Sequence, residues 1–348
     1  MRRGLLLVLV TAVMLAAIGG VALAATFTGT DGPDRIDGTN LNDTISTLGG
    51  NDKASGRDGD DKISGGEGDD ELSGRGRLGC DPSSPEEAET LVQEDDEDTM
   101  SGGPGNDAVW GGFGNSTLYG GYGNDGLTGD CGDDLMYGGP GDESWLHSFY
   151  GAGLHGRYGD DHIYGQAGDD DFEGDEGNDT ISGGTGVDMV KGYYGDDTIT
   201  GGEDSDALGG EEGDDTLIGE GGDDLLVAET GVDRVAGGKD NDILLDGALG
   251  LASAPLTPEE EAIVFWLPTD LRNLGYRFFR DELDYTGQAV AFEGDASQDT
   301  FSGGGGNDTF YVARGQTPDT VNCGAGTDKV FADPEDKVAS DCEEVIRG

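Results

Sequence analysis

Aspartate recurs at intervals of nine residues through most of this chain. Between Gly165 and Val227, seven consecutive nine-residue units each begin with Gly, carry Asp at the sixth place and have an apolar residue at the eighth place. Carboxylates at a fixed interval, with few basic residues beside them, are typical of ligands for a hard cation. The carboxylates that we predict to bind metal are Asp34, Asp43, Asp52, Asp61, Asp70, Asp107, Asp125, Asp134, Asp161, Asp170, Asp179, Asp188, Asp197, Asp206, Asp215, Asp224, Asp233, Asp242, Asp299 and Asp308.

The composition gives the chain a strongly negative charge and little material for an apolar core. It has 74 Asp and Glu against 19 Lys and Arg, a formal net charge of -55, and 68 of its 348 residues are Gly. This charge argues against nucleic acid as a partner. A chain so charged and so rich in Gly is expected to be disordered unless something besides apolar burial stabilises it. Bound cations that neutralise the acids would supply that stability.

Each nine-residue unit predicts a turn followed by a short strand. The glycines around the sixth-place Asp permit positive φ and therefore a tight turn. The three residues that follow are too few for a helix and suit a very short strand, in which only the eighth-place side chain points inward. One inward side chain per strand makes a thin core. The strands must therefore stack on one another, as in a solenoid.

The repeat is interrupted twice, which divides the chain into six segments. Ser84, Pro85 and Glu87 fit the start of a short helix through residues 86–93, although a solvated acidic loop fits equally well. Thr257, Pro258 and Glu260 fit the start of a second short helix that runs through residues 262–267. The segments are an export signal over 1–24, repeats over 25–74, an acidic insert over 75–92, repeats over 93–246, an aromatic-rich insert over 247–293, and last repeats with a cap over 294–348.

The N-terminus has the features of an export signal. Arg2 and Arg3 precede an apolar run from Leu5 to Ile18, and the sequence Ala22-Leu23-Ala24 resembles a cleavage site. The alternative is an uncleaved membrane anchor, for which the apolar run is short. We expect a secreted protein, extracellular or at the cell surface, with no membrane span after cleavage. Export would place it in an oxidising compartment in which its four cysteines can pair.

The aromatic-rich insert has two interpretations. Its aromatic side chains could fold back and cover part of the repeat. Alternatively, these aromatic residues together with Arg272, Arg277 and Arg280 could form a docking patch for a partner.

The repeat resembles a known family. The sequences GGTGVD at Gly183–Asp188 and GEGGDD at Gly219–Asp224, each with an apolar residue two places further on, are similar to the GGxGxDxUx nonapeptide of the RTX, or hemolysin-type, calcium-binding family. The resemblance implies an all-β fold, a right-handed parallel β-roll (solenoid) in which two units make one coil. It also implies several Ca²⁺ ions between stacked turns, held by the sixth-place carboxylates and by turn carbonyls. The segments containing Cys323 and Cys342 resemble the closing units of secreted bacterial members.

If two units make a coil, the imperfect units can be assigned to sides. We place Asp98, Ser116, Asp134, Ala152 and Asp170 in succession on one side, and Asp107, Asp125, Glu143, Asp161 and Asp179 on the other. The degenerate unit from His147 to His155 keeps the period, so we expect the solenoid to continue through it. Sites on the first side would then be weak or empty before Asp170.

Four cysteines permit three pairings. A bridge between Cys323 and Cys342, which flank the terminal cap, would fix the last coil and leave Cys80 for Cys131. We favour this pairing, and the other two remain open.

No pattern in the chain indicates catalysis. His147, His155 and His162 lie near one another in sequence, but there is no HExxH motif, and His162 falls at an outward seventh place. No GxSxG motif occurs. We therefore expect a calcium-binding structural or adhesive protein that is not an enzyme, with a cell-surface or matrix component, or a second copy, as its further partner. The alternative is a non-catalytic remnant or accessory subunit of an RTX-type secreted hydrolase or toxin.

Overall fold

The computed structural model describes residues 24–74, 97–143, 153–246, 249–251, 290–292, 298–312 and 317–347. In these ranges the regular elements are all β strands. The helices predicted for residues 86–93 and 262–267, and nearly all of the predicted export signal, lie outside the described residues. Among the described residues, no helix has the length and apolarity needed to cross a membrane.

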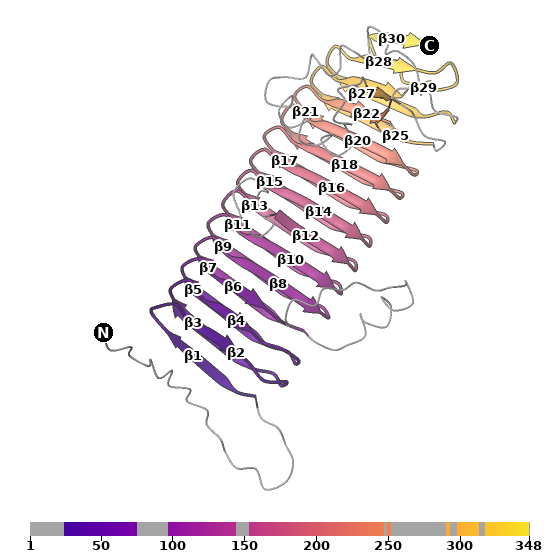
Figure 1. Ribbon diagram of the computed structural model, residues 1–348. Helices are drawn as coiled ribbons and strands as arrows, with labels where there is room; N and C mark the ends of the chain where they lie inside the picture. Colours follow the sequence, from indigo (N-terminus) through magenta and orange to yellow (C-terminus); the bar gives the residue numbers. More distant parts are fainter. Residues whose placement is uncertain are drawn as a thin grey trace, which may run out of the picture. The chain divides into compact units, whose positions relative to one another are not determined.

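The strands alternate between two parallel sheets, which we call sheet A and sheet B. Sheet A holds the odd-numbered strands of the repeat (Figure 1): β1 Thr26–Thr30, β3 Thr44–Gly49, β5 Lys62–Glu67, β7 Thr99–Pro104, β9 Thr117–Tyr122, β11 Leu135–Pro140, β13 His162–Ala167, β15 Thr180–Thr185, β17 Thr198–Glu203, β19 Thr216–Gly221, β21 Arg234–Lys239, β25 Thr300–Gly305, β27 Thr320–Ala325 and β29 Lys337–Val338.

Sheet B holds the even-numbered strands: β2 Arg35–Asp37, β4 Lys53–Ser55, β6 Glu71–Ser73, β8 Ala108–Phe113, β10 Gly126–Cys131, β12 Gly153–Tyr158, β14 Asp171–Glu176, β16 Met189–Tyr194, β18 Ala207–Glu212, β20 Leu225–Thr230, β22 Ile243–Leu245, β26 Thr309–Val312, β28 Lys329–Ala332 and β30 Glu344–Arg347. A separate antiparallel pair joins β23 Leu249–Leu251 to β24 Val290–Phe292, inside the predicted aromatic-rich insert.

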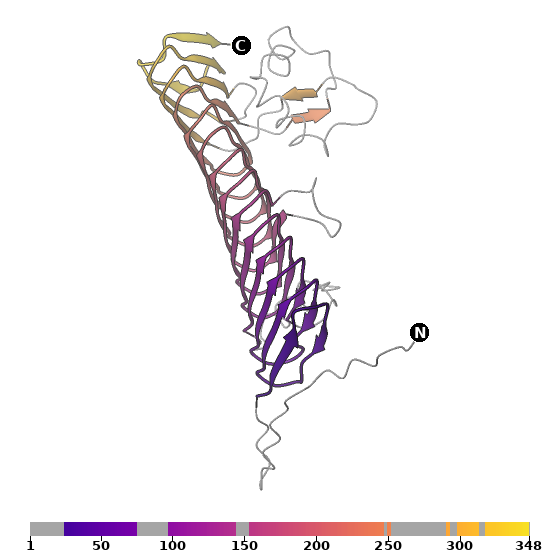
Figure 2. The same ribbon diagram turned by 90° about the vertical axis from the view of Figure 1, so that its left-hand side faces the viewer.

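The chain divides into two compact units, residues 1–162 and 163–348, and each is described by itself below. In the second unit β15 pairs in parallel with β17, and Thr180 lies opposite Thr198. Since the partners are 18 residues apart, two nine-residue units make one coil. The parallel solenoid that the resemblance implies is thus confirmed, and Figure 2 shows its coils from a second direction.

In each of the two compact units, the core consists mainly of eighth-place side chains, as the repeat predicts. In sheet A of the second unit, Ile181, Ile199 and Leu217 lie opposite one another in register, and each is at most 1% exposed. Sheet B contributes Val190, Leu208 and Leu226 in the same way, each buried. Most strands are six residues long instead of three, because pairing continues through the next two or three residues, which are often Gly. The predicted strand length was therefore too short.

At one place the pairing register shifts by nine residues, although the sequence does not mark an interruption there. The backbone N–H of Asp134 donates to Oδ1 of Asp161, which is 27 residues further on and so nine more than a regular coil requires. In the same unit Gly126 of β10 pairs with Gly153 of β12, also 27 residues apart. The pairing register therefore shifts by nine residues between Glu143 and Gly153, and residues 144–152 lie outside the described residues. The expectation that the solenoid continues through the degenerate unit holds for Leu154, which is buried in β12, but the coils do not keep their 18-residue spacing across that unit.

This shift also corrects our assignment of sides. In the first unit Asp161 follows Asp134 on the sheet A side, where we had placed Ala152. Glu143 follows Asp125 on the sheet B side, and the N–H of Asp125 donates to its Oε1 at 3.4 Å. The pair Asp134–Asp161 has both of its carboxylates. The physical reason for the error is that a register shift of nine residues preserves a nine-residue period and so leaves no trace in the sequence phase.

The two long interruptions are bridged in the same way. The N–H of Asp61 donates to Oδ1 of Asp98, 37 residues away, and the N–H of Asp233 donates to Oδ1 of Asp299, 66 residues away. Both hydrogen bonds have normal lengths of 2.8 Å. The coils on either side of each insert thus stack as directly as uninterrupted coils do.

Candidate metal centres

The predicted ligands occupy one structural position, the residue immediately before each strand. Of the 20 predicted aspartates, Asp34 is half-buried, and all the others are buried with at most 3% exposure. The structure places four further aspartates at the same position that our list of ligands omitted: Asp98, Asp319, Asp328 and Asp336. The omission at the C-terminal end arose because the spacing there departs from nine, so those units look irregular in sequence.

One oxygen of each carboxylate is used to connect neighbouring coils. In the second unit the backbone N–H of Asp188 donates to Oδ1 of Asp206, and the N–H of Asp206 donates to Oδ1 of Asp224, both at 2.9 Å. On the sheet A side the N–H of Asp197 donates to Oδ1 of Asp215 at 2.8 Å. We call this series, in which each Oδ1 accepts the sixth-place N–H of the preceding coil, the sixth-place ladder.

The other oxygen is buried and accepts no hydrogen bond from the described part of the chain. This holds for Oδ2 of Asp52, Asp70, Asp107, Asp125, Asp134, Asp188, Asp197, Asp206, Asp215, Asp224, Asp242, Asp308 and Asp328. A buried carboxylate oxygen without a donor carries a large desolvation cost. Bound cations are one way in which proteins offset that cost.

Most of these oxygens face a space that exists because the first-place residue is Gly, while at Asp52 and Asp328 the first-place residues are Thr47 and Cys323. A Cβ atom at Gly183 would lie 2.2 Å from Oδ2 of Asp188 and 2.7 Å from the carbonyl oxygen of Gly201 in the next coil. At Gly219 the corresponding distances to Oδ2 of Asp224 and to the carbonyl oxygen of Gly237 are 2.2 and 2.4 Å. A carboxylate oxygen and a carbonyl oxygen of the next coil therefore converge on one point. Such an oxygen-only donor set fits Ca²⁺.

The glycines of the turn serve two different purposes. The second-place Gly184 and the fourth-place Gly186 have φ of 118° and 123°, a region that side chains rarely adopt. The second place nevertheless accepts other residues, such as Gln166 with φ of 85°. First-place glycines have no such φ, and they are needed because a side chain would occupy the space in front of Oδ2. The metal-site space is thus set by the first-place residue.

The N-terminal coil departs from this arrangement. Oδ2 of Asp34 accepts the N–H and the hydroxyl of Thr30, and Oδ2 of Asp43 accepts the N–H and the hydroxyl of Thr39. These two predicted ligands already have donors at the oxygen that faces the metal space elsewhere. They fit an ion less well than the aspartates that follow them.

The surroundings of the ladder make its carboxylates hard to ionise without a cation. Burial raises the pKa of Asp206 from 3.8 to about 9, and the hydrogen bond from the N–H of Asp188 only partly opposes this. The charges of Asp188 and Asp224 raise it further. The pKa of Asp188 is about 8, chiefly through burial as well. The neighbouring carboxylates of the sixth-place ladder thus share one environment, which favours the binding of a cation or a proton to each of them.

A second ladder runs along the surface of the turns, through the fifth place. Oδ1 of Asp196 accepts the N–H of Asp214 in the next coil, and Oδ1 of Asp214 accepts the N–H of Val232, both at 2.9 Å. Here each side chain points to the following coil, whereas sixth-place side chains point to the preceding coil. The side chains of Asp196 and Asp214 are exposed, and we did not predict this series. The signal was present as a frequent Asn or Asp beside the sixth-place Asp.

One group within the second compact unit, outside the regular pattern, also contains possible metal ligands. Carboxylate oxygens of Asp246, Asp299 and Asp319 lie within 4.8 Å of one another, and all three residues are buried. Asp246 stands at a first place, where most coils have Gly, so the sixth-place pattern does not predict it. This group could hold a cation in the second unit.

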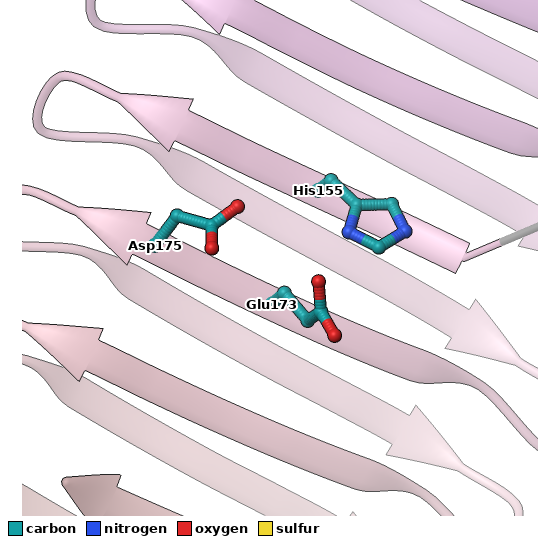
Figure 3. A group of neighbouring side chains, drawn as sticks. All are labelled: His155, Glu173 and Asp175. Atoms are coloured by element: carbon teal, nitrogen blue, oxygen red, sulfur yellow. The ribbon is translucent and has the colours of Figure 1, made fainter. Parts of the chain in front are cut away.

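Figure 3 shows the side chains of His155 on β12, in the first compact unit, and of Glu173 and Asp175 on β14, in the second. Glu173 and Asp175 are two residues apart on one strand and so point to the same face. His155 is buried and belongs to the first unit, while the two acids belong to the second. His162 is exposed, as its seventh place predicts. His147 lies outside the described residues.

The disulfide predicted at the cap is confirmed. Cys323 and Cys342 are joined, with their Cα atoms 5.2 Å apart. Cys131 is also disulfide-bonded. Cys80, the partner that we favoured for it, lies outside the described residues.

Comparison with known proteins agrees with the geometry of the ladder. The family model of the RTX calcium-binding nonapeptide repeat matches residues 28–72, 94–142, 154–244 and 292–316 through overlapping copies, which is more than half of the chain. No curated protein matches the sequence. Among solved structures, the chain is similar to a hyperactive, Ca²⁺-dependent, β-helical antifreeze protein from an Antarctic bacterium, with 15% identity over 90% of this chain and 83% of that one. The TM-score of 0.41 is too low for this likeness to inform the function. On the strength of the repeated family matches, the chain belongs to the RTX calcium-binding nonapeptide repeat family.

Proposed function

We propose that this protein is a secreted structural or adhesive component whose solenoid folds only when calcium binds along the sixth-place ladders. The observation that carries the proposal is the series of buried Oδ2 atoms that accept no hydrogen bond from the described residues. Where the first-place residue is Gly, as at Gly183 and Gly219, this oxygen and a carbonyl oxygen of the next coil converge on one space. These are ligands arranged for an ion between coils.

Charge supports the coupling of folding to binding. Neighbouring coils lie ~4.8 Å apart, and unit charges at that separation repel by roughly 1 kcal/mol even in a water-like dielectric. About one ion per intact unit, on the order of 20 ions, would cancel ~40 of the 55 negative charges if each ion offsets two. Without that neutralisation, repulsion summed along two ladders opposes the stacked state.

The role outside calcium binding follows from the export signal and from the organisation of the chain. Extracellular calcium-binding modules work at ~0.1 to 1 mM calcium, so an exported solenoid would remain loaded. The chain has no catalytic motif that we recognise, and we propose that it is not an enzyme. The surfaces outside the ladders would then provide contacts with a cell-surface or matrix component.

A calcium titration of the purified chain tests the folding part of this proposal. We expect weak β-sheet circular dichroism in chelator and a cooperative gain of β-sheet signal as calcium reaches ~0.1 to 1 mM. A spectrum that is unchanged by calcium would refute the coupling. A pull-down from the native cell surface, with and without chelator, tests the adhesive part: calcium-dependent recovery of a surface component supports it, and no recovery counts against it.

A further inference from the structure

In the first compact unit of the chain, Thr47 stands at a first place where the neighbouring coils have Gly. It occupies the first place of the nine-residue repeat that contains Asp52. The equivalent residues one coil before and one coil after it are Gly29 and Gly65. Thr47 is fully buried. A side chain therefore fills the space that first-place glycines leave open in the neighbouring coils.

The neighbouring coils show what that space normally contains. A Cβ atom at Gly65 would lie 2.1 Å from Oδ2 of Asp70 and 2.8 Å from the carbonyl oxygen of Gly102. The two oxygens that converge on the first-place space are therefore the carboxylate of the same unit and the first-place carbonyl of the next coil. For Thr47 the corresponding oxygens belong to Asp52 and Gly65.

The hydroxyl of Thr47 already binds one of these two oxygens. Its Oγ1 donates to the carbonyl oxygen of Gly65 at 2.5 Å, with a longer contact of 3.3 Å to the carbonyl oxygen of Ser64. The sixth-place ladder is unaffected, because the N–H of Asp34 still donates to Oδ1 of Asp52, and the N–H of Asp52 donates to Oδ1 of Asp70. The site at Asp52 therefore differs from the neighbouring sites only at its first-place residue and at the carbonyl oxygen that this residue binds.

We propose that Thr47 closes the calcium site at Asp52, so that this coil is held by a hydroxyl-to-carbonyl hydrogen bond in place of an ion. Its Cβ and methyl groups occupy the space between the donors, and its hydroxyl uses the carbonyl that would otherwise bind calcium. The inference rests on calcium binding by the other sixth-place aspartates and does not depend on an adhesive role. It removes Asp52 from the set of metal ligands that the sequence predicts.

Counting ions on the full chain tests this directly. Native mass spectrometry in calcium chloride should show one more bound ion per chain for Thr47→Gly than for the wild type. Thr47→Ala, which keeps Cβ but removes the hydroxyl, should bind the same number as the wild type. An unchanged count in Thr47→Gly would overturn the proposal, and a lower count would show that Thr47 is itself a ligand.

The reciprocal variant is Gly65→Thr, which places the same side chain at the site of Asp70. It should bind one ion fewer than the wild type, with its β-sheet circular dichroism in calcium as the check on folding. If Gly65→Thr folds and retains the wild-type count, a first-place side chain does not close a site and the proposal is wrong. If Gly65→Thr does not fold, the Thr47→Gly count decides. A wild type that binds no calcium would instead refute the proposed function.

Discussion

The coils between Asp170 and Asp242 and the coils between Asp299 and Arg347 belong to the same unit but are stabilised differently. The first set keeps 18 residues per coil and has a core that is aliphatic apart from Phe172, and all but one of its first-place residues are Gly. In the second set, ladder partners are 20, then 17 and 15 residues apart. The same two sheets are therefore built on a strict period in one region and without it in the other.

The C-terminal coils replace open metal space with side chains and a covalent bond. Their core includes the fully buried Phe301 and Phe310, and Tyr311 stacks on Phe331 with ring centroids 4.6 Å apart. Three buried first-place residues there are Val312, Cys323 and Ala332. The difference teaches that stacked coils of this kind can be held by apolar packing and a disulfide where they are not held by ions.

Removal of calcium should give the largest effect and separate the two regions. In chelator, amides between Asp170 and Asp242 should lose their protection against hydrogen exchange, because the ladder carboxylates there would repel without ions. Amides of β27 and β28 should keep more protection, because apolar packing and the disulfide do not depend on calcium. Mass spectrometry of exchange on the full chain measures both, and equal loss in both regions would contradict the comparison.

Acidification should partly replace calcium. The pKa values of Asp188 and Asp206 in the folded chain are about 8 and about 9, above the ordinary value of 3.8, so the folded state binds more protons than the unfolded state. The stability that this provides is fully present below about pH 4 and is lost as the pH rises towards about 9.

In chelator, β-sheet circular dichroism should therefore be stronger at pH 4.5 than at pH 9. With calcium present the trend should reverse, because protons compete with calcium for the carboxylates. The same pH dependence with and without calcium would contradict this account.

Asp206→Ala should remove one ion site and one link between coils. It leaves the buried N–H of Asp188 without its acceptor, which costs ~1–3 kcal/mol, in addition to the lost calcium. The matched control is Asp214→Ala at the exposed fifth place, which should cost less than ~1 kcal/mol. Urea unfolding in saturating calcium compares the two, and equal losses would show that the two ladders contribute alike.

Removal of the disulfide should affect only the C-terminal coils. Cys323→Ser together with Cys342→Ser should cost ~2–4 kcal/mol in the stability of that region and leave the number of bound calcium ions unchanged. Hydrogen exchange in β27 and β30 reports the first effect, and native mass spectrometry reports the second. A fall in ion number would mean that the disulfide also supports the calcium sites.

Much of the architecture was predictable because the repeat encodes it locally. The sixth-place aspartates are buried at equivalent positions, and the eighth-place residues form the core, because both depend on places within a single unit. The second ladder, at the fifth place, was missed because an exposed Asn or Asp looks like an ordinary solvated residue in sequence. The extension of most strands through the first three places of the next repeat was missed because Gly usually weakens a strand.

The sequence by itself determined the period, the inward side chains and the preference for a hard cation, and it favoured the cap disulfide that the structure contains. Only the tertiary structure decided which residues pair across neighbouring coils, since a shift of nine residues between Glu143 and Gly153 leaves the period intact. It also decided which carboxylate oxygen links coils and which faces the metal space, and that the hydroxyl of Thr47 binds the carbonyl of Gly65. These contacts join residues that are 18 or 27 positions apart in sequence. The closure of each coil brings these residues together, and a local pattern does not specify that closure.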